Sequence, residues 1–216
     1  MIYSPDHKFL LIKNKKVGGT SLEVELSKVL PENAIVTPIF PSNINHQPRN
    51  HRNIFYNHIS YSEIENLLDL KNVMSYVVVR NPYDVVLSAF FHSLHRKLKT
   101  PTYEIEEKTD LSEEVNLYFK EFSLHVWPEG IDKTHKLYTK NDRIIVNKIL
   151  YYENGIENEI NKILIGHNIK PIQITTFEKK YKPEWATFEK IFNKEQINII
   201  NNKHAWEFDN LEYSSV

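Results

Sequence analysis

The sequence predicts an α/β fold in three layers, with a central, mostly parallel sheet flanked by helices. Three stretches, 9–30, 73–97 and 143–165, each hold a short apolar run, a polar loop and then apolar residues at helical spacing. Such alternation is typical of parallel α/β sheets. The chain has 216 residues, of which 41% are hydrophobic, and this length suits one domain with one core. We therefore expect a single domain over residues 1–216.

The first stretch opens with residues 9–12, an apolar run that is long enough for a buried strand and too short for a helix. After a polar loop, Thr20 or Ser21 is expected to cap a helix that Pro31 ends. A short second strand is expected over residues 34–37. A strand, a helix and a second short strand thus precede the rest of the sheet.

Residues 41–53 are rich in Pro, Asn, His and Arg and indicate a loop, and residues 60–70 predict a helix. Residues 73–79 form the strongest predicted strand, because they are β-branched and nearly all apolar, as in a central parallel strand buried on both faces. The helix after it is expected over residues 84–97.

The third stretch is expected to hold a strand within residues 143–152 and a helix over 153–165, with Gly166 as its C-cap. Further helices are predicted over residues 111–124 and 195–206 from the spacing of their apolar residues.

Charge and cysteine content exclude several classes of function. The chain carries 27 Lys and Arg against 28 Asp and Glu, a net charge of −1, so nucleic acid is not expected as a partner. The absence of cysteine excludes disulfides, iron–sulfur clusters and thiolate catalysis. No apolar run approaches the roughly 18 to 20 residues of a membrane span, and residues 1–6 lack the features of a signal peptide. We therefore expect a cytoplasmic protein without a membrane span.

The loop after the first strand predicts a cradle for a phosphate-type anion. Residues 13–21 read Lys-Asn-Lys-Lys-Val-Gly-Gly-Thr-Ser and contain two of the five glycines of the chain. Glycines before a helix let backbone N–H groups converge on an anion, and the helix dipole adds positive potential. The lysines precede the glycines, so the nucleotide triphosphatase fingerprint is not matched. The alternative is a Gly-Gly turn beside solvated lysines.

The loop after the strongest strand begins with Arg80. Ligands of open α/β sheets bind beyond the carboxyl ends of the strands, and the fork of a guanidinium suits a phosphate. Ser88 follows eight residues later, in the first turns of the next helix, and can return towards the strand end. The alternative is an ion pair between Arg80 and Asp84 within the loop.

Together the two loops resemble those of the sulfotransferases that use 3′-phosphoadenosine 5′-phosphosulfate. Residues 15–21 resemble the family's phosphosulfate loop, Pro-Lys-Thr-Gly-Gly-Thr-Ser, and residues 78–90 resemble its 3′-phosphate-binding strand and helix. Residues 152–160 are similar to its Tyr-Glu-Asn-Leu segment. Residues 202–213 are similar to the closing helix and aromatic tail of the carbohydrate-type members. The resemblance implies a P-loop-like sulfotransferase fold.

The resemblance also implies roles for individual residues. Lys16 would contact the 5′-phosphosulfate and neutralise the leaving phosphate, while Arg80 and Ser88 would hold the 3′-phosphate. The family usually has proline at position 15, threonine at 17 and often histidine at 13, where this chain has Lys15, Val17 and Lys13. The donor-binding residues expected on this basis are Lys13, Lys15, Lys16, Val17, Gly18, Gly19, Thr20, Ser21, Arg80 and Ser88. 3′-Phosphoadenosine 5′-phosphate, or PAP, would be the product, and no metal would be required.

Transfer of a sulfuryl group to a hydroxyl needs a base, and His58 is the first candidate. Residues 56–61 resemble a Gly-His-Ile-Ser element of the family, with Asn57 in place of the glycine, and uronyl 2-O-sulfotransferases carry a histidine in this interval. An imidazole with an ordinary pKa near 6.5 is largely neutral at pH 7. The alternative is a structural histidine before a helix, in which case Glu23 or His92 would be tested next.

Two other functions compete with this interpretation. One is a P-loop-type nucleotide kinase or phosphotransferase. The other is a non-catalytic protein that binds an anionic glycan through five cationic side chains, namely Arg49, His51, Arg52, Lys13 and Lys15. A metal site on His92 and His95, which are spaced i,i+3, has no third ligand of clear register. For the sulfotransferase, a saccharide or glycan hydroxyl is the expected acceptor.

Overall fold

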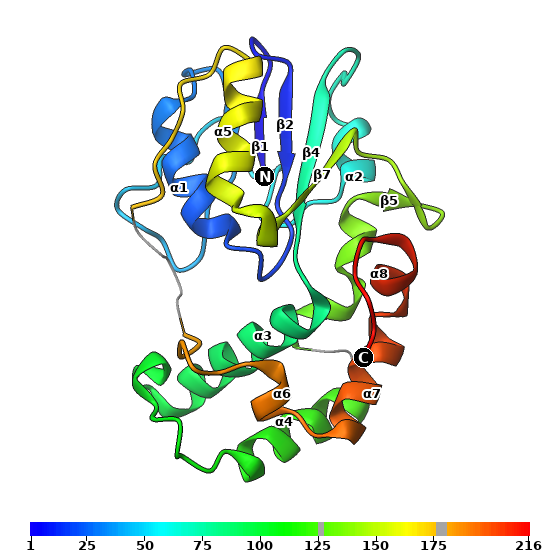
Figure 1. The fold of residues 1–216 in the computed structure, drawn as a ribbon. Coiled ribbons are helices and arrows are strands. Elements are labelled where there is room, and N and C mark those ends of the chain that lie inside the picture. The colour runs from blue at the N-terminus through cyan, green and yellow to red at the C-terminus, as the bar shows by residue number, and fades with distance from the viewer. Residues whose placement is uncertain (125–127, 176–180) are drawn as a thin grey trace. The chain divides into compact units, whose positions relative to one another are not determined.

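The structure is a computed structural model that describes residues 1–124, 128–175 and 181–216. The chain divides into two compact units where a single domain was expected (Figure 1). Unit 1 comprises Met1–Arg80 and Thr134–Glu178, and unit 2 comprises Asn81–Lys133 and Lys179–Val216. Each unit is described by itself below.

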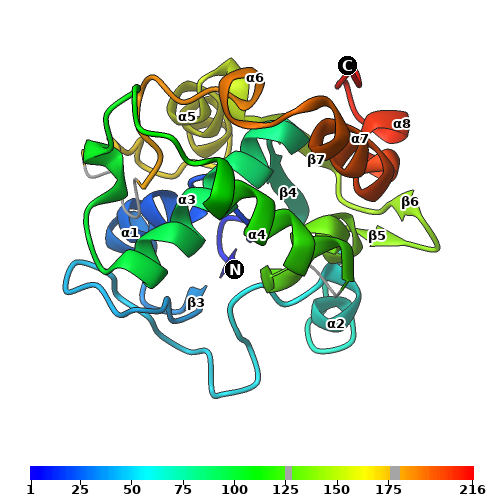
Figure 2. The ribbon, with the colours of Figure 1, turned by 90° about the horizontal axis from the view of Figure 1, so that it is seen from below.

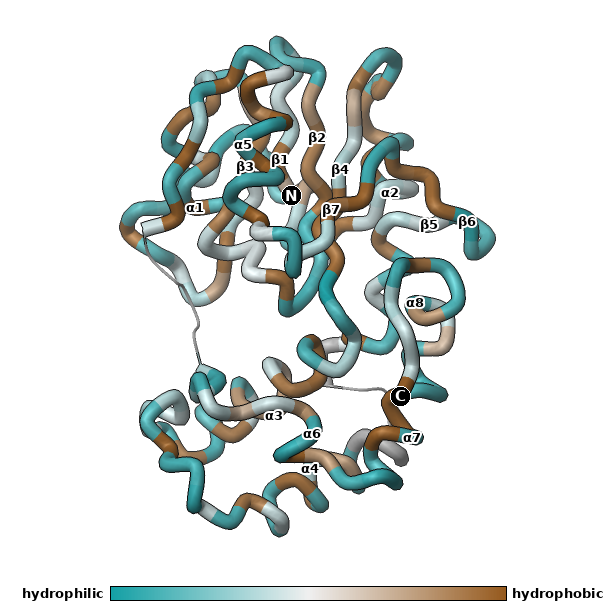
Figure 3. The backbone as a smooth tube through the Cα atoms, in the orientation of Figure 1, coloured by the Kyte–Doolittle hydropathy of each residue, from teal (hydrophilic) through white to brown (hydrophobic). Residues whose placement is uncertain are grey.

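Unit 1 is built on a five-stranded mixed sheet, and the fold is accordingly of the α/β type. The predicted strands at residues 9–12, 73–79 and 143–152 are confirmed, and they pair in parallel with one another. All four side chains of the first of them are buried, and Figure 3 shows its hydrophobic character. The strand order is β3 (Ile35–Val36), β1 (Ile2–Ser4), β2 (Phe9–Ile12), β4 (Met74–Val79), β7 (Lys148–Tyr151).

The sheet is less parallel than expected, because β1 runs antiparallel to both of its neighbours, β2 and β3. Two of the four strand pairings are therefore parallel and two are antiparallel. A tight turn closed by the Lys8 amide and the Pro5 carbonyl, 3.1 Å apart, reverses the chain between β1 and β2. With three residues, β1 is too short to give a periodic signal in the sequence.

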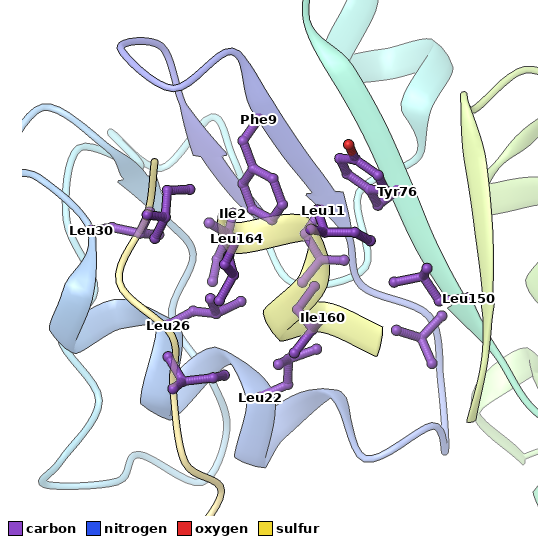
Figure 4. Packing of buried hydrophobic residues seen from close by; sticks show 14 of the residues in the cluster. Ile2, Phe9, Leu11, Leu22, Leu26, Leu30, Tyr76, Leu150, Ile160 and Leu164 are labelled. Carbon is purple, nitrogen blue, oxygen red and sulfur yellow. The ribbon is translucent and has the colours of Figure 1, made fainter. Parts of the chain in front are cut away.

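Helices α1 (Gly19–Val29) and α5 (Ile156–Gly166) cover one face of the sheet. Helix α2 (Tyr61–Glu65) and the hairpin of β5 (Thr139–Lys140) and β6 (Arg143–Ile144) lie on its other side (Figures 1 and 2). Elements of unit 1 thus lie on both sides of the sheet, with α1 and α5, of 11 residues each, on one side and the five-residue α2 on the other. Figure 4 shows the packing between the sheet and helices α1 and α5. The residues involved include Ile2, Phe9, Leu11, Leu22, Leu26, Leu30, Tyr76, Leu150, Ile160 and Leu164.

Three helix ends differ from the expectation. Helix α1 begins at Gly19, and its N-cap is Gly18 rather than Thr20 or Ser21. Helix α5 extends through Gly166, so the predicted cap is its last residue and His167 is the C-cap. The predicted helix 60–70 ends after five residues, although Ser60 caps it with a side chain that accepts from the Glu63 amide.

Unit 2 is helical around an aromatic core. The predicted helix 195–206 is divided at His204 into α7 (Lys194–Lys203) and α8 (Ala205–Asn210). The other helices of unit 2 are α3 (Pro82–Leu98), α4 (Ser112–Leu124) and α6 (Phe188–Ile191). The 3-10 helices are η1 (Thr102–Glu104) in unit 2, η3 (Tyr152–Asn154) in unit 1, and η2 (Pro128–Leu137). The core includes Tyr83, Phe90, Phe91, Tyr118, Phe119 and Phe192. Within the described ranges, no helix has the length and apolar character needed to cross a bilayer.

Candidate functional site

Three strand ends of unit 1 meet at one edge of the sheet, because β2, β4 and β7 are parallel. Arg80, the first residue after β4, donates a hydrogen bond from Nη1 to the carbonyl oxygen of Lys16, 3.2 Å away. The guanidinium of Arg80 also lies over the ring of Tyr152, 4.6 Å from the ring centroid. Tyr152 is the first residue after β7. The segments that follow all three strands are thus in contact.

The loop between β2 and α1, residues 13–18, is bent by left-handed backbone conformations. Lys16 has a φ of 58° and Gly18 a φ of 71°. A Cβ atom at Gly18 would lie 3.1 Å from a ring carbon of Tyr152, so only glycine fits there without a shift of that ring. Backbone that alternates between left- and right-handed conformations turns N–H groups towards a common point, where anions bind.

Helix α1 adds donors to this loop. The first N–H groups of an α-helix have no carbonyl partner within the helix, and α1 begins at Gly19, directly after this loop. No acidic side chain lies in the first turn of α1 to compete with an anion. Residues 13–21, which we call the cradle, therefore have the backbone geometry that an oxyanion needs.

Lys13, one of the expected donor-binding residues, has a charged partner within unit 1. Its side chain is buried, and its ammonium forms an ion pair with Oε2 of Glu23 in α1. A buried ammonium requires a charged or polar partner, and the pair with Glu23 provides one. Lys13 therefore does not present its charge to a ligand in this structure.

The other cradle residues are partly exposed or belong to the core. Lys15 and Lys16 are half-buried, and the Lys15 amide donates to Oδ1 of Asn14 at 2.8 Å. Val17 is buried in the hydrophobic cluster of unit 1, so only its backbone is placed to contact a ligand of the cradle.

His58 lies against the start of the cradle. Its Nδ1 is 3.0 Å from the carbonyl oxygen of Lys13, 45 residues away. A carbonyl oxygen can only accept, so Nδ1 carries the proton, and Nε2 of the neutral ring holds a lone pair. Burial is the main cause that lowers the pKa of His58 to about 4, and the positive charges of Lys13 and Lys15 lower it further. The hydrogen bond to the Lys13 carbonyl raises this pKa, but by less. The imidazole is therefore neutral at pH 7 with a lone pair on Nε2, and the lowered pKa makes it a weaker base than an ordinary histidine.

Glu23, the alternative base, is enclosed. It is buried in the second turn of α1, and its two oxygens bind Lys13 and, at 2.6 Å, the amino group of Met1. Burial alone would raise the pKa of Glu23, but the charges of Met1 and Lys13 outweigh burial and lower it. An ionised carboxylate between two ammonium groups is a poor proton acceptor.

The predicted site residues beyond Arg80 belong to unit 2. Ser88 is half-buried in the second turn of α3, and its expected pairing with Arg80 on a 3′-phosphate stays a prediction. His92 and His95 both stack on the ring of Tyr181, with ring centroids 4.9 and 4.5 Å apart. Among the described residues, no group of three His, Asp or Glu side chains is arranged to hold a metal ion.

Arg49 has a structural position at the end of α1. Its guanidinium donates to the backbone carbonyls of Ser27, at 2.9 Å, and Leu30, at 2.8 Å. It therefore satisfies carbonyls that a helix end leaves without partners. Arg49 and Lys13 are two of the five basic side chains that a glycan-binding module would use. Both have partners within unit 1, namely helix-end carbonyls for Arg49 and the carboxylate of Glu23 for Lys13.

No protein-family model matches the chain, and no curated protein matches it significantly.

Proposed function

We propose that this protein is a sulfotransferase that moves a sulfuryl group from 3′-phosphoadenosine 5′-phosphosulfate to a hydroxyl group. The observation that supports the proposal most is the hydrogen bond from Arg80 to the Lys16 carbonyl. It joins the two loops that resemble the donor-binding segments of sulfotransferases, at the carboxyl edge where α/β sheets bind ligands. A P-loop-like sulfotransferase fold is part of this proposal.

In the proposed complex, the cradle holds the 5′-phosphosulfate. Backbone N–H groups at Gly18 and Gly19 and the hydroxyls of Thr20 and Ser21 donate to its oxygens. The ammonium of Lys16 neutralises the negative charge that develops on the leaving phosphate, and such charge stabilisation is a major source of rate enhancement. Arg80 holds the 3′-phosphate, which distinguishes this donor from adenosine 5′-phosphate.

His58 is the base of the proposed reaction. Its Nε2 takes the proton of the acceptor hydroxyl as the hydroxyl oxygen attacks sulfur in line with the bond that breaks. The bond between sulfur and the bridging phosphate oxygen breaks, PAP leaves with the electron pair of that bond, and the proton remains on the imidazolium. The Lys13 carbonyl fixes the tautomer that this step needs, as the orienting partner of a catalytic histidine does. A saccharide hydroxyl is the first acceptor to test.

Ligand-induced stabilisation tests the donor site. PAP at about 100 times its dissociation constant should add roughly 2.7 kcal/mol to the free energy of unfolding, without added metal. A kinase would instead be stabilised by ATP with Mg²⁺, and a glycan-binding module by a sulfated oligosaccharide. Lys16→Ala should reduce the shift with PAP. No shift with millimolar PAP, or a shift with ATP and Mg²⁺ alone, contradicts the proposal.

A further inference from the structure

The Lys13 side chain crosses the base of the cradle. It starts directly after β2, and its stem passes Gly19, where an added Cβ would lie 3.4 Å from Cγ and 3.7 Å from Cε of Lys13. Its ammonium ends on Glu23, ten residues further along the chain. The Lys13–Glu23 ion pair therefore links the end of β2 to α1 and closes the loop between them.

The backbone of the same residue holds the proposed base. The Lys13 carbonyl accepts the hydrogen bond from Nδ1 of His58. Lys13 lies one residue beyond Ile12, the last paired residue of β2, so the sheet ladder does not fix the orientation of this carbonyl. The ion pair with Glu23 is the contact by which the Lys13 side chain ties this residue to α1.

His58 itself depends on this contact. It has a φ of 63°, a conformation that costs free energy for a residue other than glycine and persists only where the surroundings hold it. Within the described residues, the bond to the Lys13 carbonyl is the hydrogen bond of the imidazole. A shift of that carbonyl would release both the orientation of the ring and the preference for one tautomer.

We infer that Lys13 and Glu23 are positioning residues: their buried ion pair places the Lys13 carbonyl, and through it the orientation and tautomer of His58. The catalytic consequence depends on the proposed function, whereas the effect on the imidazole does not. An ion pair of this kind is often no more stabilising than apolar residues of the same size. Three charges meet in this part of the interior, because Glu23 also binds the amino group of Met1 at 2.6 Å. A role in geometry accounts for the Lys13 ammonium among them better than a role in stability does.

The test is Lys13→Met, which removes the buried ammonium and keeps a side chain of similar length. Glu23 then keeps a charged partner, because its Oε1 lies 2.6 Å from the amino group of Met1. Glu23 is left unchanged, since replacing it would leave the Met1 ammonium buried without its counter-charge. The matched control is Lys28→Met, which removes the ammonium of the 2.8 Å ion pair with Glu25 in the same helix. Each variant loses one positive charge from an ion pair with a glutamate of α1, at a buried position for Lys13 and an exposed one for Lys28.

The readout is the tautomer of His58 in the free protein, measured from its ¹⁵N side-chain resonances at pH 7. The wild type and the Lys28→Met control should show the Nδ1–H form alone, and Lys13→Met should show a mixture that includes the Nε2–H form. Turnover of Lys13→Met should fall about 10²-fold, the effect of a misplacement of about 1 Å. A folded Lys13→Met variant with the wild-type tautomer would overturn the inference, whatever its stability.

A second variant covers failure of the first to fold. Glu23→Asp keeps both charges and withdraws the carboxylate by one methylene group, so it should shift part of the His58 population to the other tautomer. An unchanged tautomer in Glu23→Asp also overturns the inference. If wild-type protein binds no PAP but the tautomer responds as expected, the proposed function fails while the positioning pair stands.

Discussion

The two units of the molecule differ in how they hold their histidines. In unit 1, His58 binds a backbone carbonyl 45 residues away through Nδ1, and its other nitrogen keeps a lone pair. In unit 2, His92 and His95 stack on Tyr181, and Nδ1 of His95 donates to the Thr100 carbonyl at 2.6 Å. Long-range placement beside the cradle, rather than residue type, makes a histidine a candidate base.

The largest expected effect separates these histidines directly. His58→Ala should lower the rate of sulfuryl transfer by about 10²–10⁴, the usual contribution of general-base catalysis. PAP affinity, measured by calorimetry, should stay close to that of the wild type, because the donor contacts lie in the cradle and at Arg80.

His92→Ala is the matched control, and it should lose stability rather than turnover because it removes a ring that stacks on Tyr181. Circular dichroism establishes that both variants are folded before the rates are compared. Near wild-type turnover in folded His58→Ala would place the base elsewhere, and a larger loss in His92→Ala would reverse the comparison.

Arg80 and Arg49 offer a second contrast between a ligand-binding and a structural side chain. Arg80→Ala should remove a charge-assisted contact worth roughly 1.5–3 kcal/mol and so weaken PAP binding at least about tenfold. Adenosine 5′-phosphate, which lacks the 3′-phosphate, should lose less affinity.

Arg49→Ala should instead lower the free energy of unfolding, because it leaves the Ser27 and Leu30 carbonyls without this donor. Equal losses of affinity for both nucleotides in folded Arg80→Ala would assign Arg80 a purely structural role. That role would rest on its hydrogen bond to the Lys16 carbonyl and its contact with the ring of Tyr152.

The cradle backbone can be tested with glycines. Gly18→Ala should cost about 1–2 kcal/mol for the left-handed conformation alone, and more because the new methyl group meets Tyr152 at 3.1 Å. Gly166→Ala, at the end of α5, meets nothing within 4 Å and should change stability little. Urea unfolding compares the two variants, and similar losses would mean that the cradle conformation is not required.

Stability should also depend on pH. The pKa of His58 is about 4 in the folded protein against an ordinary 6.5, so the unfolded chain takes up the proton first as the pH falls. The contribution of His58 to stability is complete above pH 6.5 and is lost between pH 6.5 and 4, by at most about 1.4 kcal/mol per pH unit.

Activity should correspondingly persist until the pH approaches 4, rather than decline near 6.5. Urea unfolding of wild type and His58→Ala across this range isolates the contribution of His58. Parallel curves for the two proteins would show that the imidazole is not buried as a neutral ring.

Sequence patterns predicted the parts of the fold that have enough length to show a period. Strand β4 has six residues and was predicted within one residue of its start, whereas β1 has three and was missed. The start of α1 was misplaced because Gly18 caps it with backbone geometry, which a search for hydroxyl caps does not detect. The boundary between the units falls directly after Arg80, without a linker whose composition could mark it.

The candidate site was predicted in outline but not in its contacts. Loop composition indicated the cradle and Arg80, since glycines and cations after apolar strands carry a local signal. The burial of Lys13 was not predicted, because its partner Glu23 lies across a turn rather than at a periodic spacing. The ring of Tyr152 was recognised as part of a similar segment, but its contact with Gly18 depends on the pairing of β4 with β7.

Selective ¹⁵N-glycine labelling tests most directly whether PAP binds at the cradle. The chain has five glycines, so the amide spectrum has five signals, of which Gly18 and Gly19 report on the cradle and the other three serve as controls. Titration with PAP in the absence of metal should shift the Gly18 and Gly19 signals strongly and the others little. No shift of these two signals at millimolar PAP, or shifts confined to the control glycines, would contradict the claim.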